Sequence, residues 1–119
     1  MTVVPPLSPS RSHGDFVFLS GMTPKDASGA AVPGDVAVQT RAVLDALARA
    51  LAAEGAELSD VIRVGVYLSN LDEDYDAFNA VYREYFSAPF PARTTIGAGL
   101  RGILVEIDAV AVRAEPGKS

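Results

Sequence analysis

The sequence predicts an α+β fold in which one mixed β-sheet has both helices packed on one of its faces. Three observations lead to this prediction. The expected elements follow the order strand, helix, strand, helix, strand, strand. Each expected helix has a single apolar stripe, which can pack against one side of a sheet. No third helix is expected to cover the opposite face, and the simplest cover in so short a chain is another copy of itself.

The composition indicates a small globular protein and excludes several classes of function. The 119 residues are 49% hydrophobic and predict one domain over 1–119. Because 10 basic residues stand against 15 acidic ones, the net charge is −5, and nucleic-acid phosphates and anionic lipids are disfavoured as partners. The chain has no cysteine and one histidine, His13, so we expect no disulfide and no metal site. No stretch approaches the ~18 apolar residues of a membrane span, and we expect a cytoplasmic protein that needs no cofactor.

The first part of the chain predicts an arm, a strand and a loop. Residues 1–14 are rich in Pro and Ser, which indicates an extended arm on the surface. Residues 15–21 (DFVFLSG) alternate between two faces, with Val17 and Leu19 on one of them, and predict a strand. Residues 24–34 contain Pro, Asp, Ser and Gly at the density of turns and predict a loop.

The first helix has the clearest pattern in the chain. It is expected to begin after Asp35, whose side chain suits an N-cap, and to end before Gly55, which suits the position after a C-cap. The buried side chains expected for this helix are spaced three or four residues apart, so they form one continuous stripe. The stripe consists of Val36, Thr40, Val43, Leu47 and Leu51.

A second strand and a second helix follow. Residues 60–68 (DVIRVGVYL) predict a half-buried strand. Its expected inner face carries Ile62, Val64, Val66 and Leu68. The helix is expected to begin between Asn70 and Asp72, with acidic side chains near the positive end of its dipole, and Pro89 stops it. Its expected apolar stripe is Tyr75, Phe78, Tyr82, Tyr85 and Phe86.

The last part of the chain predicts two strands and a short tail. Residues 93–98 and 103–112 are expected to pair as a hairpin through a turn at 99–102, which contains two glycines. Residues 114–119 are expected to be frayed.

Two charged side chains in these strands are the first candidates for chemistry. Arg93 lies at the start of a strand in PFPART, and its planar guanidinium fits a carboxylate at two points. Glu106 lies in the apolar run LVEIDAVA, where burial raises the pKa of a carboxylate and suits it to acid–base work or to holding a water. Asp108 is expected on the same face. The alternatives are an Arg93 paired with a neighbouring subunit and a Glu106 on a solvated or salt-bridged face.

Three further residues are weaker candidates. Ser20 and Gly21 end the first strand, where the Gly21 N–H can stay open to a ligand, but turn chemistry is the plainer explanation. Asn79 lies on or beside the apolar stripe of the second helix and either contacts a ligand or bridges the helix to a loop. His13 is expected to be a surface side chain. The sequence contains no motif of a hydrolase triad, a nucleotide site or a zinc protease.

Several stretches are characteristic in their joint order and spacing: FVFLSGMTP, QTRAVLDAL, DVIRVGVYLSNLDEDYDAFNAVYREYF, FPARTTIG and LVEIDAVAV. In that order they resemble the RidA family of reactive-intermediate deaminases, also called YjgF or L-PSP, over residues 15–112. The resemblance implies a chorismate-mutase-like homotrimer whose sheets form an inner barrel, with ligand clefts between subunits. It also implies cofactor-free hydrolysis of 2-imino or enamino acids to 2-keto acids and ammonia, which serves metabolite damage control.

The resemblance also assigns roles to individual residues. Arg93 matches the arginine that binds the substrate carboxylate, and Glu106 matches the glutamate that holds or activates the attacking water. The positions that match groups of the substrate cleft are Ser20, Gly21, Asn79 and Thr95. Thr95 stands where many members have a cysteine, which is not the nucleophile of the reaction. The chain departs from the family in two places: LSPSRSHGDF lacks the tyrosine that closes over the ligand, and the turn at 99–102 is shorter.

The leading hypothesis is therefore a 2-imino acid deaminase. The missing tyrosine motivates an alternative, a non-catalytic trimer that binds small carboxylates or regulates other proteins. Endoribonuclease activity, for which part of the family is named, is disfavoured by the net charge and by a lysine content limited to Lys25 and Lys118.

Overall fold

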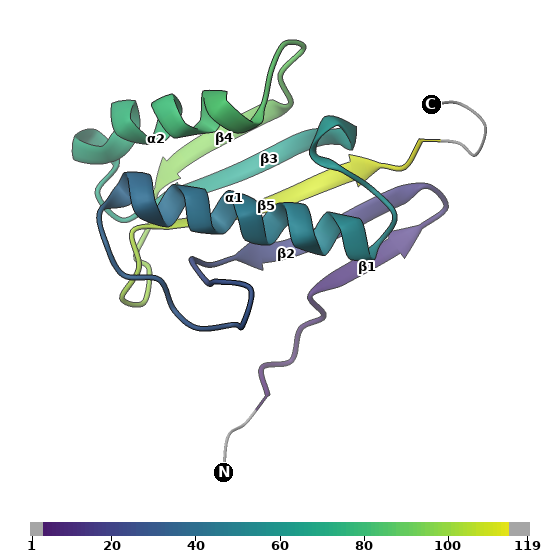
Figure 1. Cartoon of the computed structure of the whole chain (residues 1–119), viewed down its shortest axis with the longest axis horizontal. Coiled ribbons are helices and arrows are strands. Elements are labelled where there is room, and N and C mark those ends of the chain that lie inside the picture. Colours follow the sequence, from purple (N-terminus) through teal and green to yellow (C-terminus); the bar gives the residue numbers. More distant parts are fainter. Residues whose placement is uncertain (1–3, 115–119) are drawn as a thin grey trace.

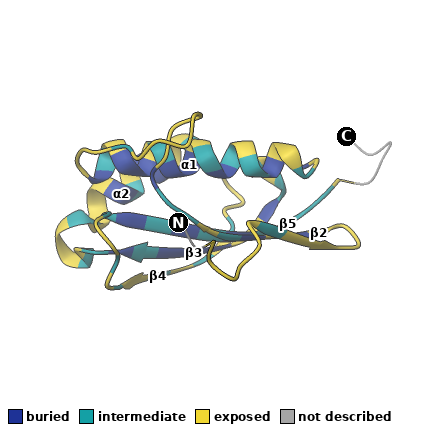
Figure 2. Cartoon of the chain, turned by 90° about the horizontal axis from the view of Figure 1, so that it is seen from below, coloured by how far each residue is buried: buried dark blue, intermediate teal, exposed yellow. Residues whose placement is uncertain are grey.

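The computed structural model of the chain describes residues 4–114 and has one sheet with both helices on the same face (Figures 1 and 2). The sheet has five strands in the order β1-β2-β5-β3-β4. The strands are β1 (Ser10–His13), β2 (Phe16–Met22), β3 (Val61–Leu68), β4 (Ala92–Gly97) and β5 (Val105–Val112). The helices are α1 (Val36–Ala53), the short 3-10 helix η1 (Leu58–Asp60) and α2 (Leu71–Tyr85). The predicted α+β class and the helices on one face are confirmed. The frayed tail predicted at 114–119 lies, apart from its first residue, outside the described residues.

The N-terminal segment contributes a strand that the sequence pattern does not indicate. Residues 10–13, expected as part of an extended arm, form β1 and pair antiparallel with β2, from Ser10 opposite Leu19 to His13 opposite Phe16. Gly14 makes the turn between them with a φ of 58°, which glycine adopts without strain. The side chains of β1 are polar, so it has no apolar alternation to reveal it. Backbone hydrogen bonding to the edge of β2 accounts for the strand.

The predicted hairpin of the last two strands is wrong. β4 pairs in parallel with β3, and β5 lies between β2 and β3, antiparallel to both. The alternate residues of β5 are buried along its whole length, which suits a central strand, whereas β4 is mostly exposed and takes the edge. The chain from 98 to 104 therefore crosses the end of β3 instead of making a tight turn.

The core lies between the helices and the inner face of the sheet. Asp35 caps α1 by accepting a hydrogen bond from the Val38 N–H at 3.0 Å, and Gly55 follows the helix with a φ of 76°, as predicted. Tyr85 joins α2 to α1 by donating a hydrogen bond to Asp45 Oδ1 at 2.9 Å, and burial together with this carboxylate raises the pKa of Tyr85 to about 12. The largest fully buried side chains include Phe78, Leu44, Leu47, Leu51, Leu68, Ile107, Val64 and Val66.

One predicted core residue of β3 faces outward. The pairing of β3 with β5 is irregular between Val61 and Arg63. Val61 is therefore buried, while Ile62, which was expected on the inner face, is 48% exposed. An extra residue in one strand shifts every earlier side chain to the other face.

The other face of the sheet has no cover among residues 4–114 (Figure 2). It carries Phe16 and Phe18, which stack with their ring centroids 6.3 Å apart and are both exposed. Ile62 and Ile96 are exposed apolar side chains as well. We call this surface the open face. In the described part of the chain, no helix is long and apolar enough to cross a membrane.

Gln39 ties two loops together from a buried position on α1. Its Nε2 donates to the Val32 carbonyl at 3.2 Å, and its Oε1 accepts from the Leu104 N–H at 2.8 Å. One side chain thereby satisfies a backbone group in the loop before α1 and another in the connection before β5.

The substitution Gln39→Ala is expected to lower the free energy of unfolding by ~1–3 kcal/mol, because it leaves both backbone groups unpaired. Urea denaturation at a fixed protein concentration measures the change. Val38→Ala, at an exposed neighbouring position, is the control. A loss for Gln39→Ala no larger than that of the control contradicts this role.

Candidate active site

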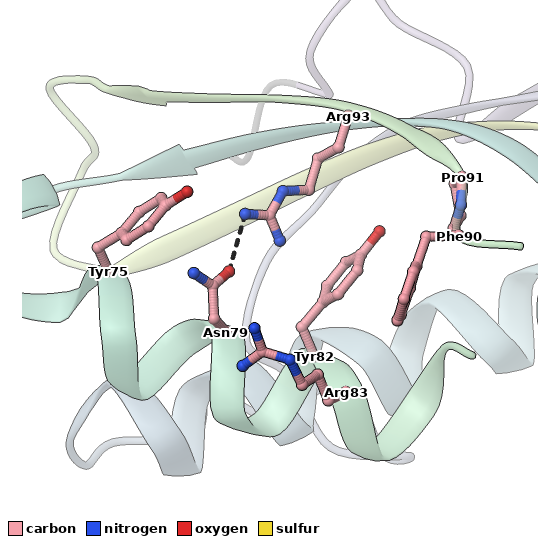
Figure 3. A pocket seen from close by; sticks show the side chains of 7 residues that line it. All are labelled: Tyr75, Asn79, Tyr82, Arg83, Phe90, Pro91 and Arg93. Atoms are coloured by element: carbon pink, nitrogen blue, oxygen red, sulfur yellow. Dashed lines mark hydrogen bonds between the residues drawn. The ribbon is translucent and has the colours of Figure 1, made fainter. Parts of the chain in front are cut away.

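Arg93 is held rigidly between β4 and α2. Its Nη2 donates a hydrogen bond to Asn79 Oδ1 at 2.8 Å (Figure 3). The guanidinium carbon lies 4.8 Å from the centre of the Tyr82 ring and 5.4 Å from that of Phe78. These contacts fix the plane of the guanidinium, because the aromatic faces attract its positive charge. Asn79, expected to contact a ligand or to bridge its helix to a loop, bridges its helix to this strand, and it also lines the pocket described below.

The local fold explains why these groups meet. α2 ends at Tyr85, and the proline-rich segment after it leads directly into β4. Arg93 stands opposite Val64 of β3, whose side chain is buried in the core. Side chains of paired residues share a face of the sheet, so Arg93 points toward the helices. Asn79 and Tyr82 come from the part of α2 that packs above it.

A pocket of ≈ 260 Å³ opens beside this arginine. We call it the Arg93 pocket. It is lined by Tyr75, Asn79, Tyr82, Arg83, Phe90, Pro91 and Arg93 (Figure 3). Asn79 is the one hydrogen-bond acceptor that the described residues give the guanidinium, so further N–H donors of Arg93 remain for a ligand. The pocket lining contains cations, aromatic rings and an amide, and no carboxylate.

Tyr82 is the buried wall of this pocket. Its side chain is almost completely buried, and its hydroxyl has no hydrogen-bond partner among the described residues. Burial raises the pKa of Tyr82, and the charge of Arg93 opposes this effect. The phenol is therefore neutral near neutral pH and adds no negative charge that would compete with an anionic ligand for Arg93.

Glu106 lies on the opposite face of the sheet from Arg93. It stands opposite Tyr67 in the pairing of β3 and β5, while its neighbour Ile107 stands opposite the buried Val66. Because side chains alternate along a strand, Ile107 points into the core and Glu106 points to the open face. One copy of the chain therefore does not bring Arg93 and Glu106 together.

Glu106 has space on the open face because position 21 is a glycine. The pairing of β2 with β5 is irregular between Leu19 and Met22, and a Cβ on Gly21 would overlap Glu106 Oε2. A second pocket, of ≈ 530 Å³, adjoins this carboxylate. We call it the Glu106 pocket, and it is lined by Thr23, Pro24, Lys25, Ala31, Gly99, Leu100, Arg101, Ile103 and Glu106.

Asp108 shares the face of Glu106, as predicted, and its carboxylate is held by a hydrogen bond from a tyrosine. Tyr67 donates a hydrogen bond to Asp108 Oδ2 at 2.9 Å across Gly65, where a Cβ would meet this carboxylate. This hydrogen bond, together with burial, raises the pKa of Tyr67.

The remaining predicted positions, Ser20 and Thr95, line neither of the two pockets. The Ser20 hydroxyl donates to the Ser8 carbonyl at 2.6 Å, and the Ser20 N–H donates to the Pro9 carbonyl at 2.9 Å, so Ser20 holds the N-terminal segment against β2. Thr95 stands opposite Val66, on the same side of β4 as Arg93, and is half-buried. Sequence reasoning missed Arg83. Its spacing of one helical turn from Asn79 is a signal that could have placed it beside this residue.

Comparisons with known proteins agree on the fold and the family. The family described as endoribonuclease L-PSP matches residues 2–113. A RutC family protein of Pyrococcus horikoshii is 39% identical over 111 residues, which cover 91% of this chain and 87% of that protein. A goat protein (Capra hircus) named 2-iminobutanoate/2-iminopropanoate deaminase is 36% identical over 100 residues, 82% of this chain and 72% of the relative. The crystal structure of a YjgF-family protein from Neisseria meningitidis superposes with a TM-score of 0.84 at 31% identity and covers 95% of this chain and 92% of that one.

The substitution Gly21→Ala is expected to displace the Glu106 carboxylate, since the added methyl group takes the space of Oε2. The free energy of unfolding should change by less than about 1 kcal/mol, because the end of a glutamate side chain moves easily. A crystal structure of the variant shows the position of Glu106, and urea denaturation gives the stability. Gly99→Ala, where a Cβ meets nothing within 4 Å, is the matched control. An unmoved Glu106 in the Gly21→Ala structure would contradict the account.

Proposed function

The chain belongs to the endoribonuclease L-PSP family, and from this membership we propose that it hydrolyses 2-imino acids and their enamine tautomers to 2-keto acids and ammonia. Relatives named 2-iminobutanoate/2-iminopropanoate deaminase support the reaction class. The observation that carries the proposal for this chain is the rigid Arg93, which has N–H donors left over at the wall of a small pocket.

In the proposed reaction, Arg93 binds the substrate carboxylate. A guanidinium fits a carboxylate at two points, and its fixed plane then sets the orientation of the whole substrate. Asn79 holds that plane through its hydrogen bond, and the Tyr82 ring holds it by packing against the guanidinium. Substrate binding therefore costs little ordering of the arginine, which helps a small ligand that makes few contacts.

Glu106 then directs water to the imine carbon. The water oxygen attacks the carbon of the C=N bond, and the electron pair of that bond moves to nitrogen. Glu106 accepts a proton from the water and passes it to the nitrogen, which gives a carbinolamine. The proton of the new hydroxyl then passes through Glu106 to the amino nitrogen, the carbonyl forms, and the C–N bond breaks to release ammonia. Water is the second reactant, so no cofactor takes part. The imine already hydrolyses in water, and positioning with one acid–base group supplies the acceleration.

The two groups meet only when a second copy of the chain is present. Arg93 lies at the edge strand of the sheet and faces the helices, while Glu106 and Gly21 lie on the open face. We propose a homotrimer in which the open faces, with Phe16 and Phe18, form an inner barrel. Each cleft then combines the Arg93 pocket of one copy with the Glu106 pocket of the next. Burial of the exposed rings stabilises this assembly.

The purified protein is expected to accelerate the decay of 2-iminobutyrate that threonine dehydratase produces from threonine. Arg93→Ala should lower kcat/KM by at least about 100-fold, since the substrate loses its orientation, and Arg93→Lys should restore only part of it. Arg41→Ala removes an exposed arginine paired with Glu84 at 2.8 Å and should keep full activity.

Other outcomes separate the alternatives. If the wild-type protein leaves the imine unchanged but 2-oxobutyrate raises its Tm, and raises that of Arg93→Ala less, the chain is a non-catalytic carboxylate-binding protein. The segment LSPSRSHGDF without a tyrosine motivates this reading. RNA cleavage that persists through purification and disappears in Glu106→Gln would overturn the deaminase proposal in favour of an endoribonuclease, against the net charge of −5.

A further inference from the structure

We propose that the Arg93 pocket selects substrates with a second acidic group, which Arg83 binds, so that the preferred imines are those of dicarboxylic amino acids. This inference rests on the proposed function, because it names the substrate class of the same site. It is carried by the position of Arg83 in the pocket lining together with Arg93 (Figure 3).

Arg83 is placed to bind a ligand. It follows Asn79 by one turn of α2, so the two side chains lie on the same face of the helix. Within residues 4–114 its guanidinium has no hydrogen bond and no ion pair, whereas Arg41 and Arg113 both pair with glutamates. Asn79 lies between the two arginines of the pocket in Figure 3. Its Oδ1 is engaged by Arg93, which leaves its Nδ2 as a neutral donor.

The charge of the pocket fits a dianionic substrate better than a monoanionic one. Two of the lining residues are arginines, and none is acidic. An imino acid with one carboxylate satisfies Arg93 and leaves Arg83 without a partner. A second carboxylate at the far end of the substrate satisfies Arg83 with a charge-assisted hydrogen bond, the stronger kind in proteins.

The shape of the pocket fits an acid with a short carbon chain. Its volume of ≈ 260 Å³ suits a small metabolite. Tyr82 and Phe90 contribute aromatic rings to the lining of the pocket, and methylene groups can pack against such rings. The imines of aspartate and glutamate, 2-iminosuccinate and 2-iminoglutarate, combine a short chain with the second carboxylate.

The test compares a diacid imine with a monoacid imine. 2-Iminoglutarate is generated from glutamate by an amino-acid oxidase, and 2-iminobutyrate is generated from threonine by threonine dehydratase. Arg83→Gln is expected to lower the ratio of kcat/KM for 2-iminoglutarate to that for 2-iminobutyrate by about 10- to 100-fold. Arg83→Lys should recover part of this ratio because it keeps the charge. Arg41→Gln changes the net charge equally at an exposed site outside the pocket and should leave the ratio at the wild-type value.

The possible results separate this inference from the proposed function. An unchanged ratio in Arg83→Gln overturns the inference while the deaminase proposal stands. If the wild-type protein hydrolyses neither imine, the deaminase proposal fails, and calorimetric binding of 2-oxoglutarate and 2-oxobutyrate decides the inference instead. If Arg83→Gln weakens the binding of 2-oxoglutarate and leaves that of 2-oxobutyrate unchanged, the result supports a pocket for diacids. Equal effects on both keto acids, or none, overturn it.

Discussion

Side chains along a β-strand alternate between two faces, and in the described chain the helices cover only one face of this sheet. That constraint determines where each candidate group lies. Arg93 shares the covered face with Val64 and is held by α2, while Glu106 shares the open face with Tyr67. The separation is a property of the strand registers and does not change with side-chain rotamers. Any reaction that needs both groups therefore needs a second copy of the chain.

The Arg93 pocket and the Glu106 pocket are built by different means. Packing fixes Arg93, because the rings of Phe78 and Tyr82 and the amide of Asn79 leave its guanidinium one plane. The position of Glu106 depends on Gly21, because a side chain at position 21 would occupy the space of the Glu106 carboxylate. A rigid cation suits substrate orientation, and a carboxylate with room around it suits a group that must hold water and carry a proton. This division of roles is what our proposed mechanism uses.

Local sequence patterns predicted most of the helices and strands. They could not predict how the strands pair, because pairing depends on residues far apart in the sequence. The stripe of α1 and its cap at Asp35 follow from helix periodicity, and the inner face of β2 follows from strand alternation. The order of the strands does not follow, since the choice between a hairpin and a crossover after β4 depends on which strand is buried. The irregular pairing that turns Ile62 outward cannot be recognised from the alternation of apolar residues in this strand. The resemblance proposes Arg93 and Glu106 as site residues, but their placement on opposite faces and the presence of Arg83 in the pocket are visible only in the structure.

The most direct test of a site shared between copies is complementation between two inactive variants. Arg93→Ala and Glu106→Gln chains with different tags are co-expressed, mixed oligomers are purified through both tags, and hydrolysis of 2-iminobutyrate is measured. In a cyclic trimer that contains both kinds of chain, about a third of the shared sites contain both intact groups, and our account predicts a corresponding recovery of activity over either variant alone. Mixed oligomers that stay as inactive as the single variants would contradict it, since a site within one chain is damaged in every copy.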